Sequence, residues 1–339
     1  MKRNLALSLT LSLSPVAFSA AAQNRPVSPA IEAAILPGAD FFARFDPAAV
    51  ERSPLVRSLW GDSVARFAAR LESSGIAASD IAEVLVSARS ESVAPEGARL
   101  GKRADGVPVV VAVSLKKKIE PEKLTSVLSE LWEGRRTATR SELEGAAVIE
   151  LWSSSPEDPP VLAAAAASGT TVFFSTHRES LEGALARERS GRHEKLGEEL
   201  ARVDASLPSG LEARTILLPA QLWERFPATR EKGEEQRPPT MSERALLPFR
   251  GLRSMAVTLD LAEEATIGLV GELADEPAAR SLETLLTTLL LPNLERVLSE
   301  RLGTAIRMED ALEVESVGST TRLTLRLGAK DLKPLSESR

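Results

Sequence analysis

One segment in the middle of the chain repeats the pattern found where its folded part is expected to begin. Leu207–Leu222 reads LPSGLEARTILLPAQL, and Leu36–Val50 reads LPGADFFARFDPAAV. In both segments Leu-Pro precedes a glycine-containing turn, Ala-Arg lies within an apolar strand pattern, and Pro-Ala follows where a helix is expected to start. We therefore predict that the chain passes twice through one structural plan, and that the second pass begins at Leu207.

Five landmarks keep the same order in the two passes. They are Leu36 with Leu207 (207 − 36 = 171), Pro47 with Pro219 (219 − 47 = 172), Ala82 with Ser254 (254 − 82 = 172), Glu120 with Glu276 (276 − 120 = 156) and Thr170 with Thr320 (320 − 170 = 150). The sequence separation between matched landmarks falls from 172 to 156 because the polar loop Arg89–Gly106 of the first pass corresponds to the short turn Ala262–Ala265 of the second. The alternative is a chance sharing of residues in a chain rich in Leu and Ala. Repeats of this length form domains packed side by side rather than units of a solenoid.

The length of the chain also favours two units. It has 339 residues, more than the roughly 250–300 at which a single core stops growing. Each pass has the order strand, helix, strand, strand, helix, strand, which is that of the split βαβ motif of ferredoxin-like folds. We expect an α+β protein with two related ferredoxin-like units, each with an antiparallel sheet, at residues 36–205 and 206–335.

Hydrophobic periodicity places the individual elements. The expected strands are Phe41–Phe45, Ile81–Ala88, Val107–Leu115, Ala146–Trp152, Val161–Ala167, Thr171–Ser175, Ala213–Leu218, Met255–Leu261, Thr266–Leu273, Leu312–Val317 and Thr321–Leu327. The expected helices are Ser53–Leu71, a segment opened by Glu120-Pro121, Glu179–Arg189, Glu194–Val203, Pro219–Phe226, and Glu276–Leu302 with a kink or break at Pro292. Val161–Ala167 is open between strand and helix, because alanine favours a helix.

The N-terminus has the pattern of a secretory signal peptide. Lys2 and Arg3 precede the mainly apolar stretch Leu5–Phe18, and the small residues that follow end at Ala22, which fits cleavage before Gln23. We expect residues 1–22 to be a signal peptide and residues 23–35 to be a polar N-terminal tether. An uncleaved membrane anchor is the alternative. Without cysteine the mature chain can carry neither a lipid on an N-terminal cysteine nor a disulfide.

The composition excludes some classes of partner. The net charge is −6, whereas a protein that binds nucleic acid normally presents a basic face. Nothing after the N-terminal segment reaches the roughly 20 apolar residues that a membrane-spanning helix requires. We therefore expect a soluble exported protein, with no membrane span after signal cleavage and with its oligomeric state open.

The residues that most often carry catalysis are sparse. The chain has two histidines, His177 and His193, each in a polar turn or linker rather than beside a nucleophile and a carboxylate. Two histidines without cysteine do not make a zinc site, which needs three or four ligands. Ser114 and Lys117 fit Ser-x-x-Lys, but at the end of a strand and without the companion motifs of penicillin-interacting enzymes. We predict no catalytic, cofactor-binding or metal-binding residues and no cofactor.

Other clusters have ordinary structural interpretations. The acidic residues Glu309, Asp310, Glu313 and Glu315 lack the spacing of a calcium loop and are expected on a wet strand edge. Lys116–Lys118 and Arg135–Arg136 are expected at solvated strand ends, where lysine also discourages edge pairing. The four tryptophans are expected in the core, with a ligand groove as the alternative; they are Trp60, Trp132, Trp152 and Trp223.

The layout resembles a loosely defined group of uncharacterised secreted bacterial proteins. The features that carry the likeness are a Leu-Pro segment leading into a strand at Leu36–Phe45, Ser53-Pro54-Leu55 at a helix start, and Leu252-Arg253-Ser254 opening a strand. An acidic hairpin and a Leu/Ala-rich helix follow. The likeness covers most of the mature chain, and it implies neither an activity nor site residues.

Taken together, these patterns favour an exported, non-enzymatic binding or interaction module in the periplasm or at the cell surface. Its partner would be a protein or a small molecule. Two alternatives stay open. One is an extracytoplasmic hydrolase whose site is assembled from residues far apart in the sequence. The other is an envelope scaffold or assembly protein that uses the helix Leu282–Leu302 against a partner.

Overall fold

The fold was analysed in a computed structural model of the chain. The structure describes residues 29–47, 75–89, 108–120, 122–126, 136–143, 146–153, 161–175, 177–192, 194–208, 211–219, 251–260, 265–290 and 311–327, with residues 69, 72, 249 and 292 as single positions. Apart from residues 69 and 219, the predicted helices at 53–71 and 219–226 lie outside these residues. The signal peptide, with its cleavage site at Ala22 and Gln23, also lies outside them.

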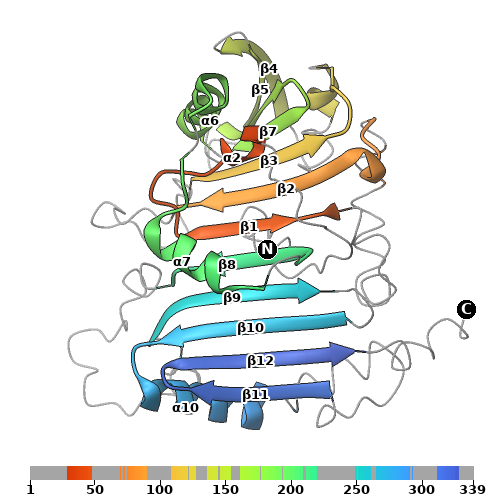
Figure 1. The fold of residues 1–339 in the computed structure, drawn as a ribbon. Coiled ribbons are helices and arrows are strands. Elements are labelled where there is room, and N and C mark those ends of the chain that lie inside the picture. The colour runs from red at the N-terminus through yellow and green to blue at the C-terminus, as the bar shows by residue number, and fades with distance from the viewer. Residues whose placement is uncertain are drawn as a thin grey trace, which may run out of the picture.

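Within the described residues, twelve strands form one sheet in which all neighbouring strands are antiparallel (Figure 1). The order across the sheet is β11-β12-β10-β9-β8-β1-β2-β3-β7-β6-β5-β4. The strands are β1 (Phe41–Phe45), β2 (Ile81–Ala88), β3 (Val109–Leu115), β4 (Arg136–Leu143), β5 (Ala146–Ser153), β6 (Val161–Ser168), β7 (Thr171–Ser175), β8 (Ala213–Leu217), β9 (Leu252–Asp260), β10 (Ala265–Leu273), β11 (Leu312–Val317) and β12 (Thr320–Leu327).

The sheet divides at its centre into two halves. The first half runs outward from β1 through β2, β3, β7, β6 and β5 to β4, and the second runs outward from β8 through β9, β10 and β12 to β11. β1 and β8 pair directly, with Phe42 opposite Ile216 and Arg44 opposite Arg214. The first strands of the two halves are therefore the innermost strands of one continuous sheet.

Three helices cover one face of the first half and of the centre. They are α2 (Pro29–Glu32), α6 (Arg178–Ser190) and α7 (Glu198–Ser206). Phe42 pairs with Ile216, and Ile216 pairs with Ala256, so these side chains share a face. They belong to one buried cluster with Leu181 of α6 and Leu200 of α7. We call this face the α7 face.

The helix α10 (Glu276–Leu285) covers the opposite face in the second half. On β10, Val270 lies opposite Ala256 and so points to the α7 face. Leu269 is the next residue and points to the other side of the sheet, as does its partner Leu323 on β12. Both pack in a second buried cluster with Leu282 of α10. The Asp275 carboxylate caps α10 by accepting a 2.8 Å hydrogen bond from the Ala278 N–H. A π-helical turn, Leu286–Leu290, follows α10 shortly before Pro292, where the helix was predicted to kink or break.

The structure confirms a mixed α+β chain with a large antiparallel sheet, and the expectation of ferredoxin-like units is wrong. In a split βαβ unit the first two strands are parallel and lie on either side of another strand. Here β1 pairs directly and antiparallel with β2, and β8 does so with β9. Hydrophobic periodicity shows which side chains are buried but not which strands are neighbours, so it could not give this order.

The boundary expected at residue 205 separates the strands of the two halves, but the two halves share one hydrophobic core at the centre of the sheet. Ile216 and Ala256 from the second half share a buried cluster with Phe42 and Leu85 from the first. The N-terminal boundary also needs correction, because Ile31, Ala33, Ala34 and Ile35 of the expected tether 23–35 are buried in that same cluster. The part of this segment from Ile31 onward therefore belongs to the fold.

Most expected strands are present, and the ambiguous alanine-rich segment is the strand β6. Sequence reasoning missed β4, whose polar sequence RTATRSEL has no apolar stripe. The strand forms because its whole length pairs with β5, from Arg136 opposite Ser153 to Leu143 opposite Ala146. Backbone pairing, rather than burial of its side chains, explains its place at the edge of the sheet.

The edge strand β11 generates a prediction about self-association. Its exposed Glu313 and Glu315 alternate with partly buried residues, and charged side chains on an edge strand discourage pairing with another chain. We expect the double variant Glu313→Val/Glu315→Val to self-associate at concentrations where the parent chain does not, measured by size-exclusion chromatography with light scattering. The control Glu179→Val/Glu276→Val removes the same charge from exposed helix positions and should leave the mass unchanged; equal association of both variants would contradict the role of the edge.

Candidate functional site

The helix α7 lies beside the centre of the sheet, next to β8 and β1 (Figure 1). Glu198 and Glu199 occupy its first turn, where negative charge is favoured by the helix dipole. Leu200 and Val203, three residues apart, are its buried residues and hold it on the sheet. Gly197 precedes α7 without a side-chain cap, and the extended residue Leu207 ends it.

Two arginines face each other beneath α7. Arg44 of β1 lies directly opposite Arg214 of β8, on the same face as Phe42 and Ile216. Directly opposite residues of antiparallel strands have Cα atoms about 4.5–5.5 Å apart. Like charges at such positions destabilise a sheet unless other groups compensate them.

One carboxylate compensates each arginine. Arg44 forms an ion pair with Glu83 of β2, and Arg214 Nε lies 2.9 Å from Asp204 Oδ1 of α7. The side chains of Asp204 and Arg214 are 20% and 24% exposed. We call Arg44, Glu83, Asp204 and Arg214 the central charge cluster.

The pairing of Asp204 with Arg214 is electrostatic rather than a well-formed hydrogen bond. Asp204 Oδ1 and Arg214 Nε are both buried, and neither atom has a hydrogen-bond partner of acceptable geometry, although they lie 2.9 Å apart. Burial raises the pKa of Asp204, and this outweighs the opposite effect of the charges on Arg214 and Arg44. Burial likewise lowers the pKa of Arg214, against the attraction of Asp204. The cluster is therefore an unfavourable place for charge, even though its formal charges cancel.

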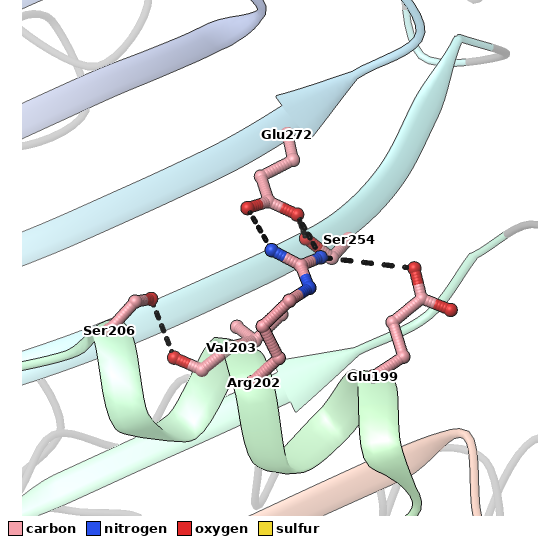
Figure 2. A network of polar contacts seen from close by, with 6 residues as sticks. All are labelled: Glu199, Arg202, Val203, Ser206, Ser254 and Glu272. Carbon is pink, nitrogen blue, oxygen red and sulfur yellow. Dashed lines mark hydrogen bonds and ion pairs between the residues drawn. The ribbon is translucent and has the colours of Figure 1, made fainter.

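A second polar contact fastens α7 to the second half of the sheet (Figure 2). Arg202 donates to both oxygens of Glu272 of β10, at 2.7 Å from Nη1 to Oε1 and 2.5 Å from Nη2 to Oε2. Ser254 of β9 donates to Glu272 Oε2 at 2.8 Å, and Glu199 of α7 lies 4.0 Å from Arg202. The hydrogen bonds from Arg202 lower the pKa of Glu272, and those to Glu272 raise the pKa of Arg202. Both shifts favour the charged forms of Glu272 and Arg202, whereas the raised pKa of Asp204 favours its neutral form.

The residues considered from the sequence do not converge on this cluster. His177 immediately precedes α6, and its backbone N–H donates to Ser175 Oγ at 3.1 Å. Ser114 is buried in β3, whereas the Lys117 ammonium is exposed and lies 2.8 Å from Asp80, so the Ser-x-x-Lys spacing does not give a catalytic pair. His193, Glu309, Asp310, Arg135 and the side chains of the four tryptophans lie outside the described part of the chain.

Several charged groups that the sequence singled out lie at the surface. Exposed Glu313 lies 3.3 Å from exposed Arg326, and Lys116 donates to the Ser79 carbonyl at 2.6 Å. The β11–β12 hairpin carries a shallow depression lined by Glu315, Val317, Thr320 and Arg322. No group of three or more His, Asp or Glu residues among the described positions is arranged to hold a metal ion. None of the described helices combines the length and apolar character needed to cross a membrane.

Comparison with protein-family models, with curated proteins and with solved structures finds no match for this chain. The assignment of the candidate site therefore depends on the charges, burial and contacts of its residues. Sequence reasoning identified the matched Ala-Arg dipeptides that contain Arg44 and Arg214, but not Glu83 or Asp204. These two acids carry no local signal, since their role depends on strand neighbours and on the path of α7.

The contact between Arg202 and Glu272 generates a prediction about pH. The pKa of Glu272 is lowered on folding, so its contribution to stability is present above the ordinary value of 4.5 and is lost as the pH falls through the folded-state value. We expect Glu272→Gln to lower the free energy of unfolding by about 1 kcal/mol at neutral pH, the upper range for a partly exposed pair. The difference in free energy of unfolding between the parent and Glu272→Gln should shrink at a pH below the ordinary glutamate value, measured by urea unfolding.

Glu199→Gln is the matched control, since the ion-pair contact of Glu199 with Arg202 is 4.0 Å long. An equal loss from both variants, or a loss from Glu272→Gln that does not vary with pH, would contradict this account.

Proposed function

We propose that the chain is an exported, non-enzymatic interaction module that acts in the periplasm or at the cell surface. The observation that carries this proposal is the central charge cluster. Replacing partly or fully buried ion pairs by apolar side chains is often neutral or stabilising, so such clusters are weak evidence for a role in stability. Groups that are costly for folding and have shifted pKa values occur preferentially at functional sites. The cluster is thus better explained by binding than by stability.

The N-terminal pattern supports export. The stretch with a basic start, an apolar middle and small residues before Gln23 is typical of a signal peptide. The described chain begins at residue 29, and Ile31 is already fully buried. Cleavage after Ala22 would remove no described residue.

We also propose that the two halves arose by duplication of one unit. Outward from the centre, the first half has the order β1, β2, β3, β7, β6, and the second has β8, β9, β10, β12, β11. A two-fold axis perpendicular to the sheet would exchange these strands one for one. The matched Arg44 and Arg214 (214 − 44 = 170) are also direct register partners, as residues beside such an axis must be. The strands β4 and β5 extend the first half alone.

Export can be tested with the full chain in a bacterial host. We expect the protein in the periplasmic or extracellular fraction, with Gln23 as the N-terminal residue in intact-mass and peptide spectra. Ala20→Arg/Ala22→Arg should block processing, because a signal peptidase requires small residues at these positions. Full-length protein that stays in the cytoplasm would contradict export.

The non-enzymatic assignment is tested against the hydrolase alternative. Purified protein should give flat progress curves with generic ester, peptide and glycan substrates. His177→Ala should not alter these curves, because a non-enzymatic protein has no turnover for the substitution to remove. A turnover that co-purifies with the protein and disappears on substitution of one residue would favour the hydrolase.

A further inference from the structure

We propose that Arg44 and Arg214 form a binding site for a carboxylate side chain of an acidic peptide segment, and that α7 is a strap whose Asp204 occupies this site in the absence of ligand. The inference rests on the proposed binding function and names the ligand class for the central charge cluster.

The first argument is the arrangement of the two guanidinium groups. Each arginine offers several N–H donors in a fixed fork that matches the two oxygens of a carboxylate. The sheet itself supplies one acid for the pair, Glu83 on β2. The second acid, Asp204, comes from a helix that crosses between the halves. Without α7, the strands would present two arginines and one carboxylate, a net positive site at the centre of the sheet.

The second argument is that Asp204 is a poor partner for Arg214. The two groups are close, but their geometry leaves a buried donor and a buried acceptor without a proper hydrogen bond. Burial also favours the neutral form of Asp204 over the charged form, because it raises the pKa of this carboxyl. A ligand carboxylate that approached Arg214 along its N–H directions would gain the hydrogen bonds that Asp204 does not make.

The third argument is that α7 is built to be displaced. The helix has nine residues, and helices of this length are marginal without tertiary contacts. Its buried residues are Leu200 and Val203, and its N-terminus has no side-chain cap. The segment before it contains Gly191 in the left-handed conformation and Gly197 at the helix start. Few buried contacts are typical of segments that open locally.

The contact between Arg202 of α7 and Glu272 of β10 is compatible with displacement of Asp204 from Arg214. Arg202 is 53% exposed, and its pair with Glu272 of β10 lies away from the two arginines. The strap can therefore remain attached to β10 through Arg202 while Asp204 leaves Arg214. The ligand class follows from Asp204 itself, which is a carboxylate side chain on a polypeptide. Because the whole chain carries a net charge of −6, recognition of an acidic peptide would be local rather than steered over a distance.

The experiment measures binding of a fluorescein-labelled hexaglutamate peptide to the full-length protein by fluorescence anisotropy. We expect Asp204→Asn to bind about tenfold more tightly than the parent chain, a change equivalent to losing one competing contact. The variants Asp204→Asn/Arg214→Gln and Asp204→Asn/Arg44→Gln should lose this gain. Arg178→Gln in the Asp204→Asn background is the matched control, since Arg178 of α6 also pairs with two glutamates but lies outside the cluster.

Folding of the variants is checked by thermal unfolding. Asp204→Asn should still unfold cooperatively, with at most a moderate loss of stability from the Arg214 charge that Asp204 no longer compensates. If Arg214→Gln fails to fold, Arg214→Lys keeps the charge but loses the forked geometry, and it should bind more weakly than Asp204→Asn alone. Competition by free succinate at millimolar concentration would show that the site accepts a small dicarboxylate as well as the peptide.

Hydrogen exchange supplies an independent readout of the strap. Peptide binding should increase exchange at the amides of α7 and leave those of α6 unchanged. Equal peptide affinity of the parent and Asp204→Asn, or undiminished binding by both arginine variants, would overturn the site. A natural partner that binds the arginine variants as well as the parent would overturn the site while leaving the proposed interaction function intact.

Discussion

The antiparallel pairing of β1 with β8 is the contact on which the rest of the structure depends. Each strand has only five residues, yet their pairing joins the two halves into one sheet. Backbone bonds extend it at both ends, from the Asp46 N–H to the Glu212 carbonyl at 3.2 Å and from the Leu218 N–H to the Asp40 carbonyl at 2.8 Å. Because strand pairing satisfies backbone groups on both sides, neither half presents an open inner edge.

This central pairing also determines where charge accumulates. Antiparallel register sets Arg44 opposite Arg214, and the sheet neighbour Glu83 forms its ion pair with Arg44. The ion-pair partner of Arg214 is Asp204 of α7, so a helix that follows the first half contacts the first strand of the second half. The path of α7, the junction of the halves and the candidate site are therefore consequences of one register.

The two halves bury different faces to different extents. On the α7 face the first half carries apolar residues such as Ala112 and Phe173, which lie opposite each other beneath helices. On the same face of the second half, β12 carries exposed Arg322 and Arg326, while α10 covers the opposite face. Polar residues at these positions keep the outer part of the second half compatible with water, and the exposed glutamates of β11 protect its edge.

The sequence by itself determined most of the segments that become strands, and that the chain is a mixed α+β protein. These properties depend on local periodicity and on turn residues, which act over a few positions. Only the tertiary structure decided the order of the strands, the existence of β4, the burial of Ile31, and the meeting of Arg44, Glu83, Asp204 and Arg214. Contacts between residues far apart in the sequence depend on register and on the path of the helices, and no local pattern encodes them. For this reason the matched Ala-Arg dipeptides were visible in the sequence, whereas the acids that accompany them were not.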